Sequence, residues 1–162
     1  MKTLLIQRHA KSSWSDASLP DHERPLNKRG KRQAPEMGAL LRREDLLPDL
    51  ILSSTAKRAE KTAEAIAEES GYEGEIRLSR DLYAAPPEAY LEALHDLPDE
   101  FSRVMVVGHN PGLEELLDVL TGESASLPTA ALAQVALGIE RWAQVSQAPL
   151  GKLVSIWLPA EG

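Results

Sequence analysis

The sequence predicts an α/β protein in which helices cover both faces of a largely parallel β-sheet, a three-layer α/β/α sandwich. Short apolar segments alternate along the chain with longer segments whose apolar residues recur at helical spacing, the order expected of strands joined by helices. The apolar run at 104–107, Val-Met-Val-Val, is unbroken, as in a parallel strand that is covered on both faces. With 162 residues and no internal repeat, the chain suits one domain over 1–162.

The first half of the chain contains three predicted strands and two predicted helices. Residues 3–7 form a short apolar strand, and residues 11–26, which are polar and contain two prolines, form a long loop. Asn27 is a suitable N-cap for a helix that contains Pro35, and this proline should either kink the helix or displace its start. The pattern then predicts a strand, a helix that ends at a glycine, and a weaker strand, at 49–53, 56–70 and 75–78.

The second half repeats this alternation. Residues 87–97 are predicted to be helical, and residues 103–108 form the clearest strand of the chain. Asn110 and Pro111 are expected to cap and start the next helix, because proline is favoured at the first helical position, and Gly122 is expected to end it. Two further strands complete the predicted sheet, with Trp142 on the connection between them, at 130–137 and 152–158.

Composition and charge argue against several classes of protein. The net charge of −7 argues against a nucleic-acid binder, and no segment reaches the roughly 20 apolar residues of a membrane span. The chain has no cysteine, which excludes disulfides and thiolate metal sites, and with no export signal we expect a cytoplasmic protein. Basic residues nevertheless cluster at 28–32, which we interpret as a solvated helix face, and at 57–58.

Three predicted strands end in side chains that can bind an anion. Arg8 and His9 end the first strand. Arg58 lies just past the second strand, at the opening of a helix, and His109 follows the clearest strand. Ligands of open α/β sheets bind beyond the carboxyl ends of the strands, so neighbouring strands would bring these side chains to one pocket. The opening of the helix at Pro111 would add free N–H groups and the positive end of a dipole, and the residues alone therefore predict an anion pocket that suits phosphate.

Imidazole and guanidinium groups are suited to phosphoryl transfer without a metal. A neutral imidazole such as that of His9 can attack phosphorus and form a covalent phosphohistidine, and nearby arginines lower its pKa and favour the free base. The planar guanidinium groups of Arg8 and Arg58 suit the equatorial oxygens, and His109 adds a further donor. The sequence contains no P-loop, no metalloprotease histidine pair and no Gly-x-Ser-x-Gly elbow.

Four motifs, in this order, resemble those of the histidine phosphatase superfamily, which has the phosphoglycerate mutase-like fold. Residues 8–12, Arg-His-Ala-Lys-Ser, are similar to the Arg-His-Gly signature, and residues 21–30 resemble the Asp-x-x-Arg-Pro-Leu-x-x-x-Gly stretch of the small SixA-type phosphohistidine phosphatases. Residues 53–63 are similar to the Ser-x-x-x-Arg-Ala-x-x-Thr-Ala segment, and residues 106–111 match the second-histidine motif. Larger members carry a capping insertion, for which this chain has no room.

The resemblance implies a metal-independent, cofactor-free phosphatase in which His9 is the nucleophile. It also implies which side chains bind the phosphoryl group: Arg8, Arg24, Arg58, His109 and Asn110. Many relatives place a glutamate after the third strand as the general acid, whereas Asp81 is the nearest equivalent here and Asp21 is a second candidate, so the acid stays open. His22 and His95 are interpreted as a loop residue and a surface residue.

The substrate that the resemblance implies is phosphohistidine in a protein, hydrolysed through a covalent phosphohistidine on His9. An open pocket without a cap would admit the side chain of a protein. The alternatives are a phosphatase for small phosphoesters and, in a different class, a phosphate-binding adaptor without catalysis. The expected partner is a phosphorylated protein; we expect neither nucleic acid nor membrane as a partner, and we expect a monomer.

Overall fold

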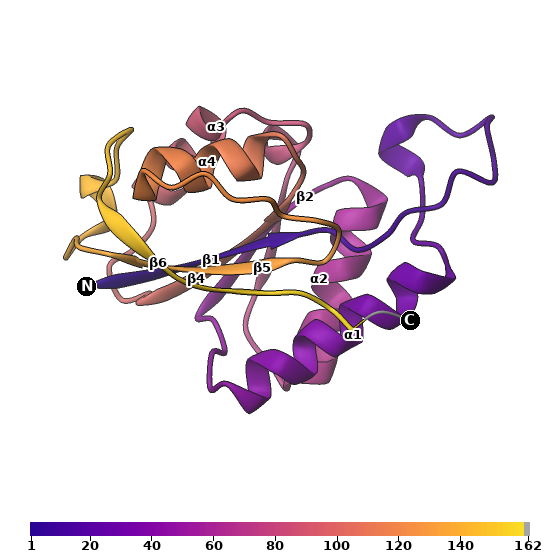
Figure 1. The fold of residues 1–162 in the computed structure, drawn as a ribbon, viewed down its shortest axis with the longest axis horizontal. Helices are drawn as coiled ribbons and strands as arrows, with labels where there is room; N and C mark the ends of the chain where they lie inside the picture. Colours follow the sequence, from indigo (N-terminus) through magenta and orange to yellow (C-terminus); the bar gives the residue numbers. More distant parts are fainter. Residues whose placement is uncertain (161–162) are drawn as a thin grey trace.

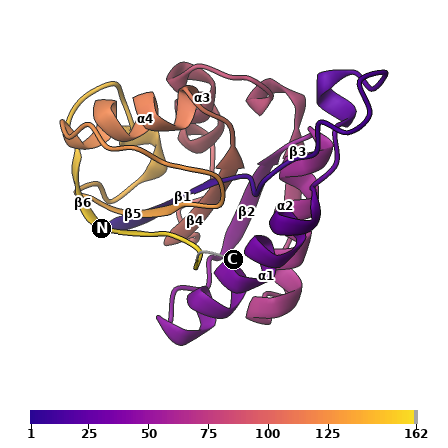
Figure 2. The same ribbon diagram turned by 45° about the vertical axis from the view of Figure 1, so that its right-hand side comes forward.

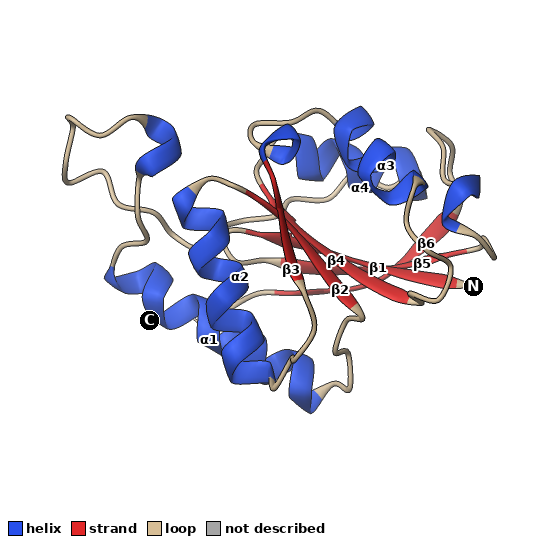
Figure 3. Ribbon diagram, turned by 180° about the vertical axis from the view of Figure 1, so that it is seen from behind, coloured by secondary structure: helices blue, strands red, loops and turns tan. Residues whose placement is uncertain are grey.

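A computed structural model describes residues 1–160, which form a six-stranded sheet with two helices packed on each face (Figure 1). The strands are β1 (Lys2–Arg8), β2 (Leu50–Ser54), β3 (Ile76–Ser79), β4 (Arg103–Gly108), β5 (Leu132–Leu137) and β6 (Gly151–Trp157). The helices are α1 (Lys28–Arg43), α2 (Lys57–Ser70), α3 (Pro87–His95) and α4 (Gly112–Thr121). Helices α1 and α2 cover one face and α3 and α4 the other (Figure 3), which confirms the three-layer prediction.

The sheet is parallel in its first four strands and antiparallel at one side. Its order is β3-β2-β4-β1-β5-β6, and the β1–β4, β2–β4 and β2–β3 pairs are parallel, whereas β5 pairs antiparallel with both β1 and β6. The register of β1 and β4 places Arg8 opposite Gly108. The carboxyl ends of β1, β2 and β4 therefore lie side by side at one edge of the sheet, as the sequence predicted (Figure 2).

The two faces of the sheet carry separate apolar cores. Along β1, Leu4 and Ile6 belong to the core under α3 and α4, whereas Leu5 between them belongs to the core under α1 and α2. Strand β4 alternates in the same way, because successive strand residues point to opposite faces. Burial on both faces explains why these central strands have continuous apolar sequences. No helix within residues 1–160 is long and apolar enough to cross a membrane.

The ends of α1 and α2 follow from local chemistry. Helix α1 begins at Lys28, where the Asn27 side chain accepts the N–H of Gly30 at 2.8 Å, and it continues through Pro35. The predicted cap is therefore confirmed, and the alternative of a displaced start is wrong. Helix α2 ends at Gly71, whose φ of 81° is a left-handed conformation that suits glycine.

The start of α4 differs from the prediction. The helix begins at Gly112, one residue after Pro111, and the Asn110–Pro111 peptide bond is cis. The Asn110 side chain does not cap the helix: its Oδ1 accepts no N–H among the described residues, and its Nδ2 donates to the Glu114 carboxylate at 3.0 Å and to the Leu127 carbonyl at 2.8 Å. Asn110 therefore ties the start of α4 to the segment before β5.

The long loop between β1 and α1 projects from the body of the protein (Figure 1). Its base is fixed by an antiparallel bridge between Ser12 and Leu26, and the Asn27 N–H donates to the Lys11 carbonyl at 3.0 Å. A short 3-10 turn, η1 (Asp21–Glu23), lies on the return segment. The loop is therefore held in place next to the carboxyl end of β1.

A glycine in the first turn of α1 permits the close approach of this loop. A Cβ added at Gly30 would overlap the backbone carbonyl of Lys11. We expect Gly30→Ala to lower the free energy of unfolding by about 1–3 kcal/mol, because neither backbone can yield cheaply. Urea unfolding measures this, with Arg32→Ala in the same turn as an exposed control that should stay within about 0.5 kcal/mol. Equal stability of the two variants would contradict the close contact.

Candidate active site

At the carboxyl ends of β1, β2 and β4, two histidines and three arginines line one cavity of about 240 Å³, and one of the arginines, Arg24, comes from the long loop. The rings of His9 and His109 lie with their centroids 5.2 Å apart, and these residues are only 7% and 5% exposed. Six of the eight residues singled out in the sequence line this cavity. The full lining is Arg8, His9, Lys11, Ser12, Trp14, Arg24, Arg58, His109, Asn110 and Thr129.

The His9 ring is fixed by a backbone carbonyl. Its Nδ1 lies 2.7 Å from the carbonyl oxygen of Ala10. Since a carbonyl only accepts, Nδ1 carries the proton and the lone pair is on Nε2. Burial lowers the pKa of His9 to about 4; the Ala10 hydrogen bond opposes this, and the guanidinium groups of Arg58 and Arg8 reinforce it. At neutral pH His9 is therefore a neutral imidazole with one defined tautomer.

A threonine on α2 positions this carbonyl. The Ala10 N–H donates to Thr62 Oγ1 at 2.9 Å, and the Thr62 hydroxyl in turn donates to the Arg58 carbonyl at 2.7 Å. The residue after His9 is thus tied to the helix that carries Arg58. Thr62 lies within the Ser-x-x-x-Arg-Ala-x-x-Thr-Ala segment, so the motif could have pointed to it.

The His109 ring is bound by a serine and presents an unpaired nitrogen. Its Nε2 lies 2.7 Å from Ser54 Oγ, and that oxygen also accepts the Ala56 N–H at 3.1 Å. Its Nδ1 is buried and has no hydrogen-bond partner among the described residues. Burial lowers the pKa of His109 to about 3, with smaller contributions from His9 and Arg58. If Ser54 donates to Nε2, Nδ1 carries a proton that can be donated to a bound oxyanion.

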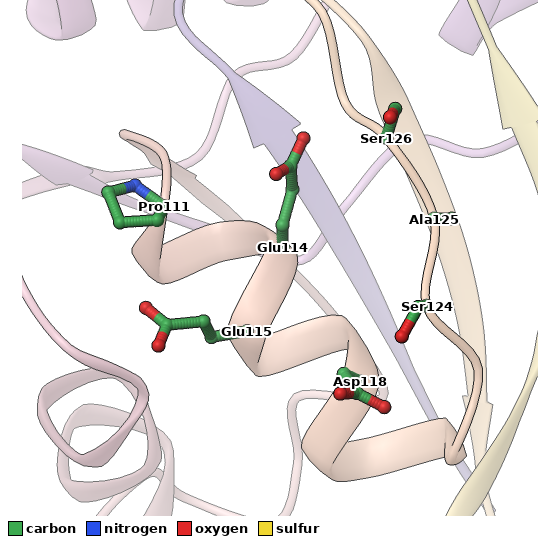
Figure 4. A pocket seen from close by; sticks show the side chains of 7 residues that line it. All are labelled: Pro111, Glu114, Glu115, Asp118, Ser124, Ala125 and Ser126. Atoms are coloured by element: carbon green, nitrogen blue, oxygen red, sulfur yellow. The ribbon is translucent and has the colours of Figure 1, made fainter.

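Arg8 is positioned through a network that ends on α4. Its Nη1 donates to the Leu127 carbonyl at 2.9 Å, and its Nε is buried without a partner among the described residues. Glu114 accepts the Leu127 N–H at 2.7 Å and the Asn110 amide at 3.0 Å through the same carboxylate oxygen. Figure 4 shows Glu114 and Glu115 leaving α4 in different directions. Glu114 therefore supports the segment that orients Arg8.

Figure 4 is centred on a second pocket, of about 380 Å³, which lies along α4 and is distinct from the histidine cavity. Three carboxylates line it: Glu114, Glu115 and Asp118. Within residues 1–160, no group of three His, Cys, Asp or Glu side chains could hold a metal ion.

Asp21 on the projecting loop organises the other two arginines. Its carboxylate accepts from Arg24 Nη1 at 2.8 Å, from Arg58 Nη2 at 2.9 Å and from the Tyr83 hydroxyl at 2.6 Å. The hydrogen bond from Tyr83, followed by those from the two guanidinium groups, holds the pKa of Asp21 far below its usual range. Such a carboxylate is ionised at neutral pH, so its geometry suits orienting arginines rather than donating a proton.

The second candidate acid lies away from the cavity. Asp81 is exposed in the short turn η2 (Arg80–Leu82), where its backbone N–H donates to Ser79 Oγ at 3.2 Å. It does not line the cavity, and none of the ten lining residues is Asp or Glu. His22 is a loop residue, as interpreted, and it also lies beside the site: its Nε2 is 2.8 Å from Thr55 Oγ1, and its ring meets the edge of Tyr83.

Comparison with known proteins agrees with the motifs. Residues 4–83 match the family described as histidine phosphatase superfamily (branch 1). An uncharacterized chloroplastic protein of Arabidopsis thaliana is 38% identical over 137 residues. That alignment covers 79% of this chain and 63% of the plant protein, so the chain spans less than two thirds of this relative's length.

Solved structures agree over nearly the whole chain. A protein from Agrobacterium tumefaciens that is described as a candidate phosphohistidine phosphatase SixA superposes with a TM-score of 0.84 at 29% identity, over 98% of both chains. Another of that name, from Nakamurella multipartitia, gives 0.84 at 26% identity, over 99% of this chain and 97% of the other. The chain belongs to the histidine phosphatase superfamily and, within it, to the SixA-type branch.

Proposed function

We propose that this phosphatase hydrolyses phosphohistidine in proteins, without a metal, through a covalent phosphohistidine on His9. The observation that carries the proposal is a buried, neutral imidazole with a free Nε2, set among three arginines in a cavity that no carboxyl group lines. The names of the two similar SixA structures support the same substrate class.

In the first step, Nε2 of His9 attacks phosphorus while the bond to the substrate imidazole breaks. The electron pair of that bond goes to the leaving nitrogen, which takes a proton from solvent. Arg8 and Arg58 meet the charge on the equatorial oxygens. Nε of Arg8 and Nδ1 of His109 are buried and have no partner among residues 1–160, so both are suited to donate to the same oxygens.

In the second step, water attacks the phosphorus of the intermediate. The bond from phosphorus to Nε2 of His9 breaks, its electron pair returns to the ring nitrogen, and the proton of the water leaves with inorganic phosphate. The Ala10 carbonyl holds the Nδ1 proton throughout, so His9 returns to its starting tautomer.

The lining of the cavity favours a phosphoramidate over an alkyl phosphate. An alkoxide leaving group has a high pKa and needs a general acid, whereas an imidazole, with an ordinary pKa near 6.5, leaves readily once protonated. The cavity supplies no Asp or Glu for this purpose among its lining residues. Substrates with a good leaving group, such as phosphohistidine and aryl phosphates, therefore fit the site best.

The function can be tested with p-nitrophenyl phosphate, a phosphohistidine peptide and glycerol phosphate, all in EDTA. We expect turnover of the first two, much slower turnover of the third, and a loss of kcat/KM of about 10³-fold or more in His9→Ala. His95→Ala, which replaces an exposed histidine at the end of α3, is the matched control and should keep full activity.

Each contrary outcome has a distinct meaning. Activity that survives His9→Ala would remove His9 from the mechanism, and activity lost in EDTA would require a metal. Faster turnover of glycerol phosphate than of the peptide would favour the small-phosphoester alternative. Phosphate binding without turnover of any substrate would favour the adaptor.

The network behind Arg8 gives a second prediction. Glu114→Ala leaves the Leu127 N–H without its acceptor and removes one of the two acceptors of the Asn110 amide, so the segment that holds Arg8 loses its support. We expect the inhibition constant of inorganic phosphate to rise about tenfold, which corresponds to roughly 1.4 kcal/mol. Glu115→Ala, at the next position of α4, removes the same charge and should change this constant less than twofold. Equal effects of the two substitutions would show that only the charge matters.

The buried histidines give a pH-dependence of stability. The pKa of His9 is about 4 in the folded protein and ordinarily 6.5, so the unfolded chain takes up the proton first as the pH falls. Stability that is present above pH 6.5 is therefore lost towards pH 4. We expect the free energy of unfolding in urea to fall between pH 7 and 5, by on the order of 2 kcal/mol from His9. His9→Asn should show a smaller fall, and an equal fall in both proteins would contradict a depressed pKa.

A further inference from the structure

The rim of the histidine cavity carries an exposed tryptophan. Trp14 lines the cavity and is 73% exposed, although large aromatic side chains rarely stay in water without a binding role. One face of its ring is covered by Arg24, whose guanidinium carbon lies 3.2 Å from the ring centroid. Arg24 is only 6% exposed and also donates to the Ser13 carbonyl at 3.0 Å. The ring is thus held at the mouth of the cavity by a well-anchored cation.

A further cavity, of about 340 Å³, lies beside the histidine cavity and is basic. Its apolar lining comes from the base of the loop and from α2, and three lysines from α1 and α2 border it. The lining is Pro25, Leu26, Lys31, Lys57, Lys61 and Ala65. Lys61 contacts Glu64 at 3.1 Å, whereas within residues 1–160 no carboxylate pairs with the ammonium of Lys31 or Lys57.

The histidine cavity and the lysine cavity lie on either side of the same two backbone segments. Arg24 lines the histidine cavity and the next residue, Pro25, lines the lysine cavity; Arg58 and its neighbour Lys57 are divided in the same way. Consecutive Cα atoms are about 3.8 Å apart, so the backbone of Lys57 adjoins that of Arg58 and the two cavities are neighbours. A peptide whose phosphohistidine enters the histidine cavity can therefore place its flanking residues at the lysine cavity.

We propose that Trp14 and the three lysines form one docking surface for the protein segment that carries the phosphohistidine. This inference rests on the proposed function and adds the chemistry of the partner: carboxylates and an apolar side chain flank its phosphohistidine. The carboxylates pair with the lysines, and the apolar side chain covers the free face of Trp14.

Charge supports this choice of partner. The chain carries a net charge of −7, so its overall field repels an acidic protein. Three lysines grouped on one surface, two of them without a paired carboxylate among residues 1–160, reverse that field locally, within a Debye length of about 8 Å. The surface thus selects acidic segments at close range, and added salt should weaken the selection.

Two 11-residue peptides with a central phosphohistidine test the surface. One is flanked by Glu and Leu and the other by Lys and Leu. We expect kcat/KM to be about tenfold higher for the acidic peptide, and Lys31→Glu to lower this ratio at least threefold. Lys152→Glu on β6 makes the same charge change at another exposed lysine and should leave the ratio unchanged.

Fluorescence tests the tryptophan directly. In His9→Ala the acidic phosphopeptide binds without turnover, and we expect it to reduce quenching of tryptophan fluorescence by acrylamide at least twofold. Trp142 is fully buried, and adding Trp14→Phe to His9→Ala should abolish the change. Protection that persists in the double variant would assign the signal to another tryptophan and overturn the role of Trp14.

The outcomes separate this proposal from the proposed function. Equal turnover of both peptides would overturn the docking surface and leave phosphohistidine hydrolysis standing. The same conclusion would follow if the ratio of kcat/KM between the acidic and the basic peptide were equal in Lys31→Glu and Lys152→Glu. Turnover of p-nitrophenyl phosphate with no turnover of either peptide would overturn both.

Discussion

The position of β4 between β1 and β2 is the constraint on which the site depends. Because these strands are parallel, their carboxyl ends meet at one edge of the sheet, and the register places Arg8 opposite Gly108. The His9 N–H donates to the Gly108 carbonyl at 3.1 Å, which extends the pairing by one residue. Backbone pairing therefore holds the two imidazoles together, and any change of register would separate them.

Around the imidazoles, most polar groups are oriented by a partner from another part of the chain. Ser54 at the end of β2 binds His109, and Asp21 on the loop binds two arginines. Burial, together with the positive charge of the nearby arginines, disfavours protonation of both His9 and His109. The same burial that costs stability at low pH keeps His9 neutral, which is the form that can attack phosphorus. Arg8 and His109 each present to the histidine cavity a buried nitrogen that has no partner within residues 1–160, and an oxyanion is the kind of group that both could bind.

The strands, the helices and six of the residues that line the histidine cavity were predictable, since their signals are local. Apolar runs marked the central strands, and the glycines after α2 and α4 marked the helix ends. The residues that were missed act over long separations. Tyr83 reaches Asp21 across 62 positions, and Glu114 supports Arg8 only through Leu127. The capping role expected for Asn110 was wrong: its Nδ2 donates to Glu114 and to the distant Leu127 carbonyl, and in that orientation its Oδ1 accepts no N–H among the described residues.

The sequence by itself determined the kinds of group that the protein can use: two imidazoles and several guanidinium groups placed after predicted strands, in motifs of one family. The tertiary structure alone decided which nitrogen of His9 is free, which carboxylate is ionised and bound, and which tryptophan stands at the rim. The physical reason is that tautomers, pKa values and exposure depend on burial and on hydrogen bonds between distant segments. Strand order and loop packing set these contacts, and local patterns along the chain do not encode them.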